Sequence, residues 1–162
     1  MVKNTFDIAI IDYGINNLFS VKRACDLLGF NSIITSDSNV INSSRSVILP
    51  GVGAFPYAMG NLKKMKLDRS ILNFVDAGKP LMGICLGMQL LMESSIEFEE
   101  TKGLGLVKGS TDKFNFDTYN MENYSVPHVG WNSCKYIKNS PLYNNIKDNS
   151  DFFFTHSYYL KN

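Results

Sequence analysis

Short apolar runs alternate with helix-like segments in the first half of the chain. Residues 6–11 are apolar except for Asp7, which predicts a strand buried on both faces of a sheet. Apolar residues then recur at helical spacing up to Gly29, which predicts a helix that begins near the asparagine pair at residues 16–17. The alternation continues with two strands and one or two helices, expected at residues 31–36, 46–49 and 54–78. Strands that alternate with helices predict a parallel sheet with crossover helices.

The second half of the chain has a different pattern. Residues 103–136 look like short antiparallel strands with polar turns at residues 117–122, and an aromatic strand is expected at residues 151–159. Before them, three glutamates are expected to form a solvated acidic patch: Glu97, Glu99 and Glu100. We therefore expect an α/β fold, with a mostly parallel open sheet, helices on both faces and a small antiparallel region. A length of 162 residues suits a single domain, residues 1–162, with its own core.

One stretch carries the candidate chemistry. An apolar run that begins at residue 80 stops at Gly83-Ile84-Cys85-Leu86-Gly87, where a helical pattern begins. A strand that turns sharply into a helix exposes its corner residue in a strained backbone, and small neighbours let the two elements approach closely. Cys85 stands at this corner, and the helix N-terminus beside it favours the thiolate. The pattern predicts a nucleophilic cysteine; the alternative is a small buried residue that closes a central strand.

A second loop is expected to face this cysteine. Pro50-Gly51-Val52-Gly53 follows another predicted central strand, and glycine permits backbone conformations that other residues avoid. Ligands of open parallel sheets bind at the carboxyl ends of the strands, where both loops lie. Backbone NH groups of Val52 and Leu86 would then form an oxyanion hole, in which each donor contributes about 3 to 4 kcal/mol to acyl transfer. The alternative is an ordinary glycine-rich loop.

Composition indicates the redox state of the thiols, the kinds of partner and the cellular compartment to expect. Three cysteines, Cys25, Cys85 and Cys134, are an odd number without framework spacing, which predicts reduced thiols. Cys25 recurs with apolar residues at helical spacing, which predicts a place in the core. The net charge of +1, with both signs scattered, predicts neither a nucleic acid nor an anionic membrane as partner. Apolar runs are too short to span a bilayer and the N-terminus lacks a signal-peptide pattern, so we expect a cytoplasmic protein. We expect no metal and no cofactor.

Six stretches together resemble a known family. In chain order they are DYGINNLFSV, LPGVGAF, GICLGMQLL, GLGL, PHVGWN and FFFTHSYY. This series resembles the glutaminase subunits of imidazole glycerol phosphate synthase, which are class I (triad) glutamine amidotransferases of histidine biosynthesis with a flavodoxin-like sheet. The resemblance covers essentially the whole chain. It implies hydrolysis of glutamine to glutamate and ammonia, and passage of the ammonia into a (βα)8 barrel cyclase subunit in a heterodimer.

The resemblance also implies roles for individual residues. Cys85 matches the nucleophile that attacks the glutamine carboxamide to give a glutamyl thioester. Val52 and Leu86 match the oxyanion-hole positions, and the Val52 donor forms fully only after the loop flips in the active complex. The positions that hold glutamine are matched by Gly53, Gln89, Ser157 and Tyr158. The stretches that face the cyclase contain Asn16, Asn17, His128 and Trp131. For Trp131 a buried tryptophan is the alternative.

The sequence departs from the family at its end. Class I amidotransferases complete the triad with a histidine and a glutamate in an HPE-like stretch, which does not occur before Asn162. The two histidines are His128 and His156, and His156 is the candidate base by sequence logic, although the resemblance places it in the strand that contacts substrate. We expect either a C-terminally truncated chain or a short subunit that keeps the interface. In both cases we expect no glutaminase turnover from residues 1–162.

Three other functions stay open at this point. The first is a related amidotransferase subunit that serves a synthase of surface-polysaccharide sugars. The second is a cysteine hydrolase or deglycase with the same elbow, in which Gln89 and the loop at residues 50–53 would have no role. The third is a non-catalytic interaction module.

Overall fold

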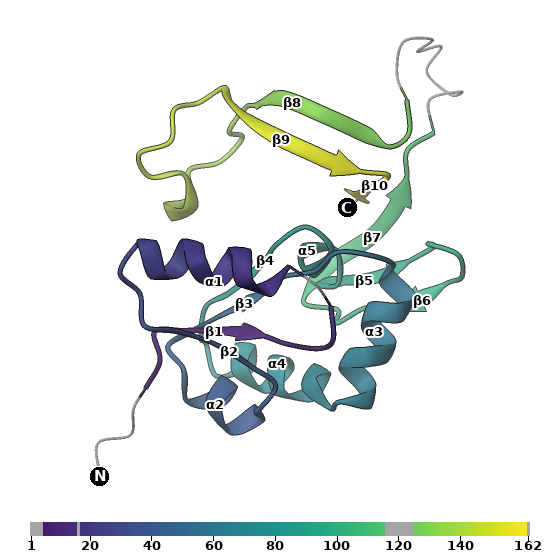
Figure 1. The fold of residues 1–162 in the computed structure, drawn as a ribbon. Coiled ribbons are helices and arrows are strands. Elements are labelled where there is room, and N and C mark those ends of the chain that lie inside the picture. The colour runs from purple at the N-terminus through teal and green to yellow at the C-terminus, as the bar shows by residue number, and fades with distance from the viewer. Residues whose placement is uncertain (1–4, 16, 116–124, 162) are drawn as a thin grey trace. The chain divides into compact units, whose positions relative to one another are not determined.

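The computed structural model describes residues 5–15, 17–115 and 125–161 (Figure 1). Contacts within the chain define two compact units. Unit 1 is Met1–Asp112 with Leu160–Asn162, and unit 2 is Lys113–Tyr159.

A parallel sheet forms the centre of unit 1. Its strand order is β2-β1-β3-β4, and every neighbouring pair is parallel. The strands are β1 (Ile8–Ile11), β2 (Ser32–Thr35), β3 (Ser46–Leu49) and β4 (Leu81–Gly83). These are the four strands that the apolar runs predict. The pairing confirms the parallel sheet.

Helices cover both faces of this sheet. Figure 1 shows α1 on one side and α2 with α4 on the other. The four helices are α1 (Leu18–Leu27), α2 (Ser38–Ser43), α3 (Phe55–Lys64) and α4 (Leu67–Asp76). Along β1, Ile8 and Ile10 pack with the buried Cys25 of α1, whereas Ala9 and Ile11 join the larger core that includes residues of α2, α3 and α4. This alternation buries the strand on both faces and confirms the predicted fold class, as well as Cys25 as a core residue.

The start of α1 agrees with the sequence prediction, but its capping does not, and one short helix has no counterpart in the prediction. Asn17 occupies the N-cap position of α1 with φ 76°, but its side chain makes no capping hydrogen bond. Asn16 lies outside the described residues. The short helix α2 was not predicted; it begins where the Asp37 carboxylate accepts a hydrogen bond from the Asn39 amide at 2.8 Å.

A second sheet has the order β10-β7-β5-β6. Its strands are β5 (Met92–Ser95), β6 (Thr101–Lys102), β7 (Val107–Lys113) and β10 (Tyr158–Lys161). The strand β6 is antiparallel to β5, but β7 pairs with β5 in parallel, so the prediction of antiparallel strands is wrong for β7. The reason lies in the preceding segment, where the amides of residues 104–106 donate to carbonyls of residues 90–92. The chain therefore passes the start of β5 before β7 runs beside it.

Unit 2 contains an antiparallel pair of strands, β8 (His128–Cys134) and β9 (Ser150–His156), in a register that pairs His128 with His156. A 3-10 turn, η2 (Pro141–Tyr143), lies between them in the sequence. This pair confirms the antiparallel region. The predicted aromatic strand at residues 151–159 is interrupted at Ser157, between β9 and β10. The turns predicted at residues 117–122 lie outside the described residues.

Candidate active site

Cys85 stands at a sharp corner between β4 and the single turn α5 (Leu86–Gln89). Its backbone has φ 54° and ψ −118°, a conformation that costs a non-glycine residue about 1 to 3 kcal/mol. The thiol is exposed, whereas Cys25 is buried. Strain at an exposed cysteine is the local geometry of a nucleophile elbow. The buried alternative for Cys85 is therefore wrong.

Glycines on both sides of Cys85 make this corner possible. A Cβ at Gly83 would lie 2.6 Å from the Met88 Cα, and a Cβ at Gly87 would overlap the Leu49 carbonyl oxygen. Any larger residue at either position would push the elbow away from its own turn or from the end of β3. The pattern of glycines in the sequence therefore reflects close backbone contact.

The loop at residues 50–53, which we call the 50–53 loop, follows β3 and lies beside the elbow. The Ile84 amide donates to the Leu49 carbonyl at 3.0 Å, and the Leu86 amide donates to the Gly51 carbonyl at 3.3 Å. The two loops thus meet at the carboxyl ends of β3 and β4. One of the two predicted oxyanion donors, the Leu86 amide, is occupied by the Gly51 carbonyl in this conformation.

Two candidate substrate residues flank the same corner. Gly53 is exposed with φ +113°, and a Cβ there would meet no atom within 4 Å. Gln89 is half-buried at the end of α5, and its backbone NH donates to the Cys85 backbone carbonyl at 3.2 Å. The structure therefore places Gln89 on the same helical turn as the cysteine.

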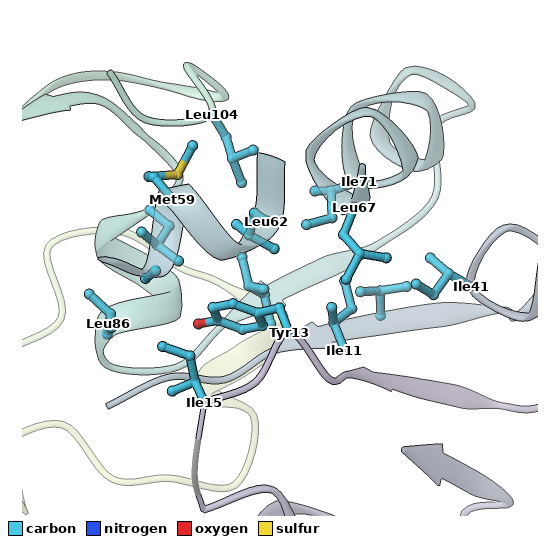
Figure 2. Close-up of a cluster of buried hydrophobic side chains, with 14 of the residues drawn as sticks. Ile11, Tyr13, Ile15, Ile41, Met59, Leu62, Leu67, Ile71, Leu86 and Leu104 are labelled. Carbon is cyan, nitrogen blue, oxygen red and sulfur yellow. The ribbon is translucent and has the colours of Figure 1, made fainter. Parts of the chain in front are cut away.

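Tyr13 contacts the 50–53 loop through a hydrogen bond, a role that the sequence did not indicate. Its side chain is fully buried in the core of unit 1, and its hydroxyl donates to the Pro50 carbonyl at 2.7 Å. Figure 2 shows the ring among Ile11, Ile15 and Leu86, with the hydroxyl oxygen directed toward the side where Leu86 lies. Burial raises the pKa of the Tyr13 hydroxyl far above its ordinary value, and the charge of the nearby Cys85 adds to this.

Glu97 was predicted to belong to a solvated acidic patch, and this is wrong for that residue. Glu99 and Glu100 are exposed, but Glu97 is half-buried and its carboxylate accepts from the Phe55 amide at 2.7 Å. Phe55 is the first residue of α3, directly after the 50–53 loop and Ala54. The carboxylate therefore satisfies a free amide at a helix N-terminus. The partners are 42 positions apart, so no local pattern could reveal the contact.

The remaining predicted residues lie in unit 2. Trp131 is 70% exposed on β8, with its ring edge-on to Phe153 at 5.6 Å, so the buried alternative is wrong. Ser157 and Tyr158 are half-buried where β9 gives way to β10.

The two histidines of the chain lie side by side in unit 2. The His128 Nδ1 and His156 Nε2 atoms are 3.2 Å apart, and His156 Nδ1 is 2.8 Å from the Tyr158 carbonyl oxygen. The other His128 nitrogen is 2.7 Å from the Asn132 side-chain oxygen. Both ring nitrogens of His156 therefore have partners within this unit.

Within residues 5–15, 17–115 and 125–161, no cluster of three histidine, cysteine or acidic side chains has the arrangement of a metal site. In the same ranges, no helix has the length and apolar character needed to cross a membrane.

Comparison with known proteins identifies relatives over most of the chain. The family model described as glutamine amidotransferase class-I matches residues 9–162. The imidazole glycerol phosphate synthase subunit HisH of Bacillus cereus (strain ATCC 14579) is 46% identical over 152 residues, which is 94% of this chain and 70% of the relative. The subunit of the same name from Geobacillus kaustophilus is 44% identical over 153 residues, 94% of this chain and 72% of the relative.

A solved structure shows the same fold. It is described as a crystal structure of glutamine amidotransferase, and it aligns with a TM-score of 0.67 over 96% of this chain and 74% of that chain. The sequence identity is 13%, so this similarity concerns the fold alone.

Proposed function

Because this chain belongs to the class-I glutamine amidotransferases, we propose that it is the glutaminase subunit of an imidazole glycerol phosphate synthase, with Cys85 as nucleophile. The observation that carries the proposal is the exposed Cys85 in a strained elbow beside the 50–53 loop. The names of relatives at 44 to 46% identity favour this function over the polysaccharide alternative. In this proposal residues 1–162 belong to one amidotransferase domain.

The proposed reaction has two steps, and residues 1–162 supply its nucleophile. The histidine and glutamate that complete the triad of class I amidotransferases have no match in these residues, so we expect the first step from them without turnover. The Cys85 sulfur attacks the carboxamide carbon of glutamine, the C–N bond breaks, and the proton of the thiol leaves with the nitrogen as ammonia. Water then adds to the resulting thioester, the C–S bond breaks, and glutamate leaves while the thiol regains a proton. In each step negative charge develops on the carbonyl oxygen of the substrate, and backbone NH donors stabilise it.

The two donors are the amides of Val52 and Leu86. The Leu86 amide donates to the Gly51 carbonyl, and this carbonyl belongs to the same peptide as the Val52 amide. Rotation of that one peptide removes an acceptor from Leu86 and turns a donor toward the site. The arrangement supports an oxyanion hole that is completed by a flip of the Gly51–Val52 peptide.

Substrate and partner contacts complete the proposal. For the binding of glutamine, the family resemblance assigns contacts to Gly53, Gln89, Ser157 and Tyr158. A (βα)8 barrel cyclase receives the ammonia, and the family resemblance assigns its contacts to Asn16, Asn17, His128 and Trp131. The 70% exposure of Trp131 supports this, because large exposed aromatic side chains are typical of protein interfaces.

A glutamine-derived chloroketone tests the proposal directly. In this reagent a chloromethyl ketone replaces the carboxamide, so a thiolate held near it displaces chloride and forms a stable thioether. We expect saturable labelling at Cys85, slowed by glutamine but not by asparagine, with Cys25 and Cys134 unlabelled in peptide mass maps. The Gln89→Ala variant should need more reagent for half-saturation. Labelling that glutamine does not slow would contradict a glutaminase and favour another cysteine hydrolase.

A further inference from the structure

We infer that Tyr13 is a positioning residue for the oxyanion hole: its hydroxyl holds the Pro50 carbonyl, so that the Gly51–Val52 peptide is the part of the loop that rotates. This inference rests on the proposed function and adds a residue to the site. Tyr13 acts through the 50–53 loop and not on the substrate.

The hydrogen bond from Tyr13 fixes the first peptide of the loop. Pro50 is buried, and its carbonyl accepts from the Tyr13 hydroxyl at 2.7 Å. A buried carbonyl without a donor is strongly disfavoured, so this peptide keeps its orientation as long as the hydroxyl is present. The hydroxyl also keeps its proton, and so remains a donor, because burial raises the pKa of Tyr13 far above its ordinary value.

Tyr13 is itself held in place. The Asn61 side-chain amide of α3 donates to the Tyr13 carbonyl at 3.0 Å. The phenol ring is fully buried in the same core as Leu86. Movement of the loop therefore cannot draw the hydroxyl along without disrupting the core, and the hydroxyl acts as a fixed point.

Planarity then limits which part of the loop can move. A peptide is rigid, so fixing the Pro50 carbonyl also fixes the Gly51 Cα. Gly51 is enclosed, since a Cβ there would overlap the Tyr13 hydroxyl and lie 3.2 Å from both the Gly87 nitrogen and the Leu86 Cβ. The next peptide carries the Gly51 carbonyl, which accepts from the Leu86 amide. Rotation of the loop therefore begins at this peptide, and the fixed Gly51 Cα brings the Val52 amide to a defined position.

The Tyr13→Phe variant removes the hydroxyl and keeps the ring. Its matched control is Tyr57→Phe, which removes a hydroxyl from a side chain that is 64% exposed. Once the hydrogen bond from Tyr13 to Pro50 is lost, the hydrogen bond from the Leu86 amide to the Gly51 carbonyl should open more often. We expect hydrogen exchange of the Leu86 amide, followed by NMR, to become roughly tenfold faster in Tyr13→Phe, the effect of one lost hydrogen bond. Exchange in α4 should be unchanged, and Tyr57→Phe should match the wild type.

Labelling kinetics separate positioning from a merely structural role. With the chloroketone, Tyr13→Phe should lower the maximal rate at Cys85 by roughly tenfold, while the half-saturating concentration stays within about twofold. Methyl methanethiosulfonate has no carbonyl, so its rate with Cys85 should stay within about twofold in the same variant.

The outcomes distinguish the inference from the proposed function. If glutamine slows wild-type labelling but Tyr13→Phe reaches the wild-type maximal rate, the inference is wrong and the proposed function stands. If glutamine does not slow wild-type labelling, the proposed function fails. In that case the hydrogen exchange of the Leu86 amide still tests whether the Tyr13 hydroxyl holds the 50–53 loop. An unchanged exchange rate in Tyr13→Phe overturns that claim, and a faster rate supports it.

Discussion

Replacement of Gly87 by alanine tests the close contact between the elbow and β3. A Cβ at this position would overlap the Leu49 carbonyl oxygen and lie 2.7 Å from its carbon and 3.2 Å from the Pro50 carbonyl carbon. All three atoms are backbone, so no side-chain rotation relieves the overlap, and the end of β3 must separate from the elbow. Two hydrogen bonds join these segments, from Ile84 to Leu49 and from Leu86 to Gly51.

The expected cost follows from these contacts. Overpacking costs about 1 to 3 kcal/mol, and loss of two backbone hydrogen bonds adds about 1 kcal/mol each, so Gly87→Ala should lower the free energy of unfolding by about 3 to 5 kcal/mol. The matched control is Gly60→Ala in α3, where a Cβ meets no atom within 4 Å. Alanine is favoured over glycine inside a helix, so this variant should gain up to about 1 kcal/mol.

Urea unfolding of the two variants, with the free energy extrapolated to water, measures both values. If Gly87→Ala were within about 1 kcal/mol of the Gly60→Ala control, the close approach of elbow and strand would be refuted, because overpacking costs more than that.

Two further predictions concern the elbow and a surface carboxylate. Cys85→Gly should be about 1 kcal/mol more stable to urea than Cys85→Ala. Glycine relieves the strain at φ 54°, but its greater freedom in the unfolded chain cancels part of this stabilisation. Equal stabilities would show that this conformation is not strained. A hydrogen bond from Lys22 holds the pKa of Asp26 below its ordinary value, so its stabilisation is present above the ordinary carboxyl pKa and is lost as the pH falls through the lower folded pKa. The urea midpoint should therefore fall below about pH 4 in the wild type and fall less in Asp26→Asn, whereas parallel profiles would contradict this link.

Local patterns accounted for the parts of the fold that short segments determine. The strands β1 to β4 were predicted because each is a compact apolar run, and α1, α3 and α4 because their apolar residues recur at helical spacing. The elbow at Cys85 was predicted because its glycines and the strand before it are adjacent in the sequence.

The features that were missed depend on contacts between distant segments. The apolar residues after Cys85 fit a helix, but the structure has one turn and then β5, since such short runs suit either element. The parallel pairing of β7 is set by hydrogen bonds to residues 90–92. The contact of Tyr13 with Pro50 joins residues 37 positions apart. Neither spacing nor composition encodes such a pairing.

The central claim is that Cys85 attacks the carboxamide of glutamine. The most direct measurement mixes the protein with glutamine, stops the reaction in acid within the first seconds, and determines the mass of the chain and of its cysteine peptides. We predict an adduct equal to glutamine less ammonia on the peptide that contains Cys85, absent with asparagine and absent in Cys85→Ala. The same adduct in Cys85→Ala, or an adduct on Cys134 in place of Cys85, would contradict the account.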